Sequence, residues 1–189
     1  MIDVLLSASV PLPTRNRAFF DSADVLAIRE AIKGLVEYVL PYGRITCGGH
    51  PAITPLLALF VREAGLGPES LTIYQSELFA GKMPEENDQF SDVRVVPAVN
   101  DDRVLSLTAM RKVMVESRKF CAAVFIGGME GLFEEKDIFV DAHPNASILP
   151  IASTGAAAQV IFEAGEYPED MKLDLTYATL FRRHLSKHI

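Results

Sequence analysis

The chain has 189 residues, with 18 Lys and Arg against 25 Asp and Glu, and its formal net charge at pH 7 is −7. This acidic balance argues against a general nucleic-acid-binding protein, because affinity for phosphate backbones comes mainly from clustered basic side chains. With 49% hydrophobic and 23% charged residues, the sequence is too apolar to remain disordered. Its length suits one folded domain, residues 1–189.

Cysteine content and hydropathy bear on the compartment. The two cysteines, Cys47 and Cys121, stand in apolar runs and are expected to be inert buried thiols. The opening residues lack the pattern of a signal peptide, and no apolar stretch approaches the ~18 residues that a membrane span needs. We therefore expect a reduced, soluble, cytoplasmic protein with no membrane partner.

Short apolar runs alternate six times with amphipathic segments. In chain order, the predicted strands are residues 4–10, 44–47, 71–74, 93–96, 122–126 and 147–151. Residues 11–21 read as a polar loop and residues 76–91 as the least regular stretch. The predicted helices are residues 25–39, 52–64, 105–119, a segment through Glu135, and residues 156–164 and 173–185.

The predicted strands are apolar throughout rather than at every second residue. A parallel sheet with helices on both faces requires this pattern, because both sides of each strand are then buried. We therefore expect a three-layer, doubly wound, mostly parallel α/β fold of the Rossmann-like class.

Small residues follow four of the predicted strands. In doubly wound folds, the turns at the carboxyl ends of the strands expose backbone N–H groups, and helix N-termini there favour anions. Together the four turns predict a rim that binds a phosphorylated ligand, although each glycine can also serve only a tight turn. The turns are Ser7-Ala-Ser9, Gly48-Gly49-His50, Gly127-Gly128 and Ser153-Thr154-Gly155.

Familiar cofactor motifs are missing from these turns. The sequence has neither the G-x-G-x-x-G of dinucleotide dehydrogenases nor the G-x-x-x-x-G-K-[ST] of P-loop enzymes, so hydride transfer and ATP hydrolysis are disfavoured. The histidines His143, His184 and His188 have no metal-ligand spacing. We expect neither a cofactor nor a metal.

The segment from Met110-Arg111-Lys112 to Gly127-Gly128-Met129-Glu130-Gly131-Leu132-Phe133-Glu134-Glu135 is the most specific passage. It resembles the signature of the LOG family of nucleotide-processing proteins, in which an Arg-Lys pair precedes a strand ending in PGGxGTxxE. Ile126 replaces the proline, Glu130 is an extra residue, and Leu132 stands at the threonine position.

Together with Gly48-Gly49-His50-Pro51, these departures make the chain more similar to the wider SLOG superfamily than to LOG itself. SLOG proteins are Rossmann-like sensors that are related to LOG, and they are found in bacterial conflict systems and in the cytosolic part of TRPM channels. The resemblance implies recognition of a nucleotide-derived signal, such as an ADP-ribose-like or NAD-like molecule or a nucleoside phosphate, with or without hydrolysis of an N-glycosidic bond. It also implies a homodimer or higher oligomer and a separate effector protein as partner.

The same residues have a physical interpretation. Backbone amides from Gly127 through Met129 and Glu130 to Gly131 can hold a phosphate at a helix N-terminus, and Arg111 can pair with phosphate or ribose. Glu134 or Glu135 can accept ribose hydroxyls or stabilise an oxocarbenium-like centre, but can also be a solvated first turn. Glu130 would weaken anion binding unless it points away.

Other candidates are less specific. His50 can bond a phosphate or stack on a base, or simply cap its helix. Arg15 and Arg17 can cover phosphates from a loop, or be plain solvated charges. Ser7 and Ser9 are candidates for hydroxyl contacts to phosphate and not nucleophiles, because no G-x-S-x-G elbow surrounds them.

Three functions are consistent with the sequence. The first is a sensor of a nucleotide-derived ligand. The second is a nucleoside-monophosphate phosphoribohydrolase or NAD-type glycohydrolase with Arg111, Glu134 and Glu135 as catalytic residues. The third is an interaction protein whose glycine turns are structural. The extra residue rotates Glu135 by roughly 100° relative to the Gly127-Gly128 pair, which disturbs catalysis more than binding and favours the sensor.

Overall fold

The computed structural model describes residues 2–188. Six strands form one sheet: β1 (Ile2–Ser9), β2 (Gly43–Gly48), β3 (Leu71–Ser76), β4 (Asp92–Val96), β5 (Ala122–Gly127) and β6 (Ser147–Ile151). The α-helices are α1 (Arg17–Ser22), α2 (Val25–Val39), α3 (Thr54–Glu63), α4 (Arg103–Glu116), α5 (Gly131–Ala142), α6 (Ala156–Glu163), α7 (Asp170–Leu173) and α8 (Tyr177–Leu185). Short 3₁₀ turns occupy residues 68–70, 77–82, 85–89, 152–154 and 186–188.

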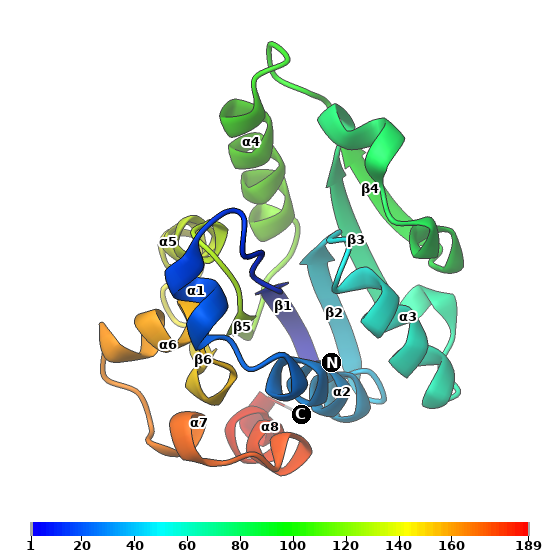
Figure 1. Ribbon diagram of the computed structural model, residues 1–189. Coiled ribbons are helices and arrows are strands. Elements are labelled where there is room, and N and C mark those ends of the chain that lie inside the picture. Colours follow the sequence, from blue (N-terminus) through cyan, green and yellow to red (C-terminus); the bar gives the residue numbers. More distant parts are fainter. Residues whose placement is uncertain (1, 189) are drawn as a thin grey trace.

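The sheet has the strand order β4-β3-β2-β1-β5-β6, and all five pairings are parallel. The chain builds outward from β1 to β4 and then returns to the other side of β1 for β5 and β6 (Figure 1). The order therefore reverses between β1 and β5. In open parallel sheets, ligand crevices lie beyond the carboxyl ends of the strands near such a reversal.

Both faces of the sheet are covered, as the continuous apolar strands predicted. Along β1, Ile2, Val4 and Leu6 pack into a core with α2, α3 and α8. Leu5 points to the other face, into a second core with α4, α5 and α6. The predicted Rossmann-like α/β class is confirmed, with a sheet that is parallel throughout.

Two parts of the chain differ from the sequence predictions. Residues 17–21, expected as loop, belong to the short helix α1, which is capped by the Asn16 side chain, an acceptor from the N–H of Ala18 at 3.1 Å. The single helix expected over residues 173–185 is two helices. Asp174 ends α7, and its carboxylate accepts from the N–H of Thr176 at 2.8 Å, a local turn that competes with helix.

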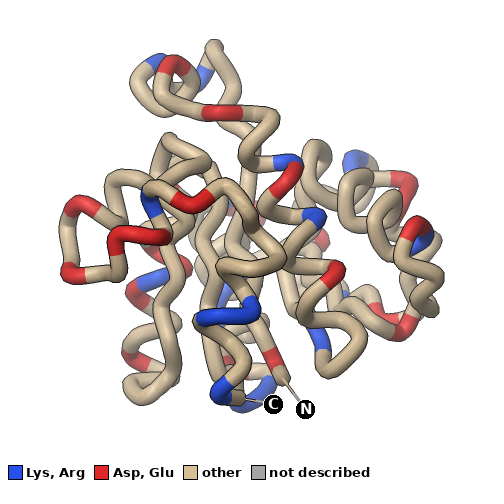
Figure 2. Tube along the Cα trace, turned by 90° about the horizontal axis from the view of Figure 1, so that it is seen from below, with Lys and Arg blue, Asp and Glu red and all other residues tan. Residues whose placement is uncertain are grey.

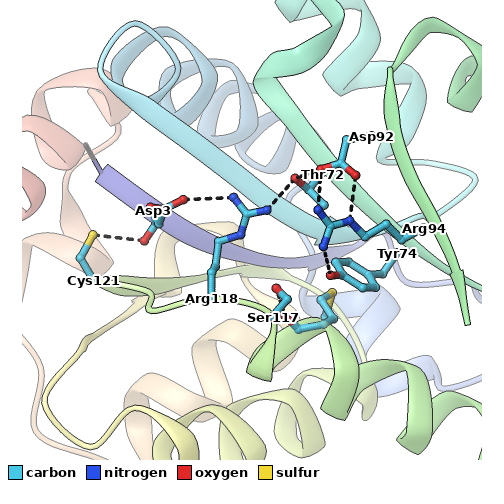
Figure 3. Close-up of polar contacts among 9 residues, drawn as sticks. Asp3, Thr72, Tyr74, Asp92, Arg94, Ser117, Arg118 and Cys121 are labelled. Carbon is cyan, nitrogen blue, oxygen red and sulfur yellow. Dashed lines mark hydrogen bonds and ion pairs between the residues drawn. The ribbon is translucent and has the colours of Figure 1, made fainter.

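A network of polar side chains ties together the amino ends of the strands (Figure 3). Arg118 donates to Asp3 at 3.2 Å and to the Thr72 hydroxyl at 3.1 Å. That hydroxyl donates to Asp92 at 2.8 Å, and Asp92 also accepts from Arg94 at 2.8 Å. Each of these two arginines is therefore paired with a carboxylate.

Charged residues lie mainly in outer loops and helices, with basic and acidic residues interspersed along the trace (Figure 2).

Among residues 2–188, no helix is both long and apolar enough to cross a membrane.

Candidate functional site

A cavity of about 390 Å³ lies beyond the carboxyl ends of the central strands. Its wall is formed by the ends of β1, β2 and β3, the beginning of α5, one side of α4 and the 3₁₀ segment after β3. The site predicted at the strand ends therefore coincides with a cavity of the size that small-molecule sites have.

About half of the predicted site residues line this cavity. Those that do are Ser9, Arg15, Gly48, Gly49, His50, Arg111, Met129, Gly131 and Glu135. The others lie around it or behind it: Ser7, Gly127, Gly128, Glu130, Glu134, Ser153, Thr154 and Gly155.

One face of α4 borders the cavity. Arg103, Leu107 and Arg111 follow one another at intervals of four residues, and Met110 lies beside them, so all four side chains share one side of the helix. Asp102 begins this helix, because its carboxylate accepts from the N–H of Leu105 at 2.8 Å. Helix α4 thus supplies two guanidinium groups separated by apolar side chains.

Arg111 is anchored to α5 by two carboxylates. Its Nε donates to Glu135 at 3.2 Å, and its Nη1 donates to Glu134, which also accepts from the Thr108 hydroxyl. Burial raises the pKa of Glu135, and the Arg111 guanidinium opposes that rise. The Ser7 hydroxyl lies near the Glu135 carboxyl and also lowers its pKa. Within residues 2–188, this hydroxyl has no partner at normal hydrogen-bond distance and angle.

The extra residue in the glycine turn does not remove Glu135 from the cavity. Helix α5 begins at Gly131, so the insertion at Glu130 is absorbed before the helix, and Glu135 stands one turn beyond Gly131. Gly131 also lets Arg111 come close, because a Cβ atom there would lie 2.6 Å from Nη2. The rotation expected from the insertion therefore does not separate Glu135 from Arg111 and the cavity.

The amides of the glycine pair are used inside the protein. The N–H of Gly127 donates to the Thr154 hydroxyl at 2.8 Å, and that of Gly128 to the carbonyl of Ser9 at 2.8 Å. Both glycines have positive φ, 57° and 87°, which L side chains rarely adopt. Within residues 2–188, the N–H groups of Met129 and Gly131 have no acceptor in a turn or cap, so these two amides are available at the helix N-terminus.

Glu130 does not line the cavity. Its carboxylate accepts from the Asn16 side chain at 2.8 Å, and this bond holds its pKa below the ordinary value. The contact joins the start of α1 to the start of α5. Arg17 lies in the same region, but pairs with Asp21 at 3.2 Å and is not part of the cavity wall.

His50 contributes a neutral imidazole. Burial, with the nearby Arg15 charge, lowers its pKa to about 4. Its Nδ1 accepts from the N–H of Ala52 at 3.1 Å, so the proton of the neutral ring is on Nε2. His50 thus stabilises the turn that precedes α3, and its Nε2 offers a donor.

The predicted Ser153-Thr154-Gly155 turn lies outside the cavity wall. Besides accepting from Gly127, the buried Thr154 hydroxyl donates to the carbonyl of Ile151 at 2.6 Å, and Ser153 pairs with the Tyr177 hydroxyl at 3.1 Å. Gly155 has φ 70° and packs against the backbone of Ser22. The Thr154 hydroxyl thus links this turn to the glycine turn at the end of β5.

Four polar wall residues were missing from the sequence prediction. Gln75 and Ser76 end β3, Lys82 follows in the 3₁₀ segment, and Arg103 begins α4. The position of Gln75 and Ser76 after an apolar strand was a usable signal, because neighbouring parallel strands end at one edge. Lys82 and Arg103 carried no such signal, since they come from segments whose path depends on the tertiary fold.

The wall is strongly cationic although the chain is acidic. Arg15, Lys82, Arg103 and Arg111 line it together with the carboxylate of Glu135, and Glu134, outside the wall, also pairs with Arg111. Among residues 2–188, no cluster of three or more His, Cys, Asp or Glu side chains is arranged to hold a metal. A cationic pocket at the carboxyl end of a parallel sheet is typical of α/β proteins that bind small anionic ligands.

The chain belongs to the SLOG cluster3 family, whose family model matches residues 18–185. The predicted resemblance to the SLOG superfamily is confirmed, and membership indicates, in general terms, sensing of a nucleotide-derived ligand. The fold is also similar to the crystal structure of the structural-genomics target TM1055, with a TM-score of 0.61 and 14% identity over 97% of this chain and 99% of that one. No curated protein matches the sequence.

Proposed function

We propose that this protein is a sensor that binds a nucleotide-derived small molecule in the cavity above β1, β2, β3 and α5. The observation that carries the proposal is the charge of the cavity wall, in which Arg15, Lys82 and Arg103 add to an Arg111 that is already paired with Glu134 and Glu135. A phosphorylated ligand supplies the negative charge that such a wall lacks. The ligand class that SLOG membership indicates agrees with this chemistry.

Two features support a location for the phosphate at the α5 end. The uncommitted N–H groups of Met129 and Gly131 lie at a helix N-terminus, where anions are favoured. Arg111 is held beside Gly131 by Glu134 and Glu135, so its guanidinium is positioned before a ligand arrives. A pre-oriented arginine loses little freedom on binding.

Binding is tested by thermal unfolding and calorimetry with AMP, NAD and ADP-ribose. Arg15→Ala removes a cation from the cavity wall, whereas Arg17→Ala removes one from the same segment that pairs with Asp21 instead. We expect Arg15→Ala to weaken binding about tenfold, the loss of one charge-assisted bond, and Arg17→Ala to leave affinity unchanged. If none of the three ligands stabilises or binds the wild-type protein, the proposal fails.

Hydrolysis of an N-glycosidic bond is the second candidate, favoured by one observation. Glu135 is a buried carboxyl with a raised pKa that lines the cavity beside Arg111, and carboxyls of this kind act in glycoside hydrolysis. Glu135→Gln separates the two functions. In a sensor it leaves a phosphorylated ligand bound, whereas in a hydrolase it abolishes release of the free base, which is measured by chromatography.

A further inference from the structure

Gln75, at the end of β3, is a wall residue with an unused hydrogen-bonding group. Its side chain is only 4% exposed and lines the cavity. Its Nε2 is buried and has no hydrogen-bond partner within residues 2–188. Because buried polar groups in folded proteins are nearly always paired, an unpaired amide in a cavity wall indicates a partner supplied by a ligand.

The carboxamide lies against Gly49 on the neighbouring strand end. A Cβ atom on Gly49 would lie 1.8 Å from Nε2, so the amide packs directly against bare backbone. The N–H of Gly49 donates to the carbonyl of Tyr74 at 2.8 Å, which fixes the two strand ends relative to each other. The terminal torsion of glutamine is soft, so the carboxamide can turn its N–H or its oxygen into the cavity.

Phe79, Leu107 and Met110 give the cavity wall apolar surface. The Met110 methyl lies 3.7 Å from the position of a Cβ on Gly48, so it covers the β2 end at van der Waals distance. Apolar surface with one carboxamide suits a flat heterocycle, whereas the amides of α5 and Arg111 suit a phosphate.

We propose that Gln75 is the specificity-determining residue of the site and reads the base of the ligand, through an edge that carries a hydrogen-bond donor beside an acceptor. A carboxamide offers one donor and one acceptor side by side, and the amino group and adjacent ring nitrogen of an aminopurine such as adenine match them. The proposal rests on the proposed function, because it assigns the base end of the same ligand. It leaves the phosphate at the N-terminus of α5.

The test compares AMP with purine riboside 5′-monophosphate, which lacks only the amino group. We expect the wild-type protein to bind AMP about tenfold more tightly, and Gln75→Met, which keeps the length of the side chain, to bind both nucleotides equally. Ser76→Ala is the matched control. Ser76 lines the same wall, but its hydroxyl already accepts from the N–H of Leu78, so discrimination is expected to remain.

A second readout is independent of the ligand. Because Gln75→Met removes a buried unpaired N–H, the free variant is expected to unfold at the same or a higher temperature than wild type. If Gln75→Met does not fold, Gln75→Glu, which replaces the donor by an acceptor, serves in the same comparison. Equal discrimination by wild type and folded variants overturns the role of Gln75 alone, whereas absence of any nucleotide binding overturns the proposed function and this inference together.

Discussion

Arg111 on α4 and Glu135 on α5 form a partly buried contact, with Nε and the carboxylate 3.2 Å apart, at the wall of the cavity. The guanidinium offsets the burial that raises the pKa of Glu135. The pair therefore joins the packing of two helices to the charge of the site. Its removal is expected to affect stability and ligand binding together.

Substituting one partner of this pair should be costly. Arg111→Met leaves Glu135 buried without its cation, and we expect a loss of about 3 kcal/mol at neutral pH, as for other broken buried ion pairs. Adding Glu135→Gln to the same variant removes the stranded charge and should restore much of the loss. Urea unfolding of the single and double variants measures both effects. A single variant within about 0.5 kcal/mol of wild type would contradict the importance of the pair.

Thr154 should be needed for its hydroxyl rather than its shape. Thr154→Val leaves the buried N–H of Gly127 without an acceptor, and we expect it to cost about 1–3 kcal/mol. Thr154→Ser keeps the hydroxyl and is expected to recover most of that stability. The comparison is made by chemical unfolding. Equal stability of the valine and serine variants would show that the hydrogen bond is unimportant.

Gly155 and Gly65 provide a matched pair of glycines. Both have positive φ, 70° and 67°, but a Cβ on Gly155 would lie 1.9 Å from the carbonyl oxygen of Ser22, whereas nothing lies within 4 Å of one on Gly65. Gly65→Ala should cost only the backbone strain, about 1 kcal/mol. Gly155→Ala adds a backbone clash and should cost at least about 3 kcal/mol. Similar midpoints in thermal unfolding would refute this distinction.

His50 should make the protein less stable in mild acid. Its folded pKa of about 4 lies below its ordinary value of 6.5, so between these values the unfolded chain binds a proton that the folded protein does not. The contribution is present above pH 6.5 and is lost as the pH falls toward 4. We expect wild type to lose on the order of 2 kcal/mol more than His50→Gln between pH 7.5 and pH 4.5. Parallel losses in the two proteins would exclude this role.

The sequence determined the fold class and much of the site. Continuous apolar strands such as residues 122–126 required burial on both faces, and this requirement leads to a parallel sheet between helix layers. The turns at Gly48-Gly49-His50 and Gly127-Gly128 located the ligand edge, because the carboxyl ends of parallel strands share one side. Local propensity did not detect α1, which has only six residues and no buried side chain of its own.

Tertiary structure decided which polar groups face the ligand. The N–H groups of Gly127 and Gly128 already donate to Thr154 and Ser9. Packing brings these partners together, and the spacing of residues in the sequence does not reveal them. Gln75 became a wall residue because β3 lies beside β2 in the sheet. Sequence patterns report burial and backbone conformation, whereas the pairing of a polar atom depends on contacts between distant segments, and those contacts exist only in the folded chain.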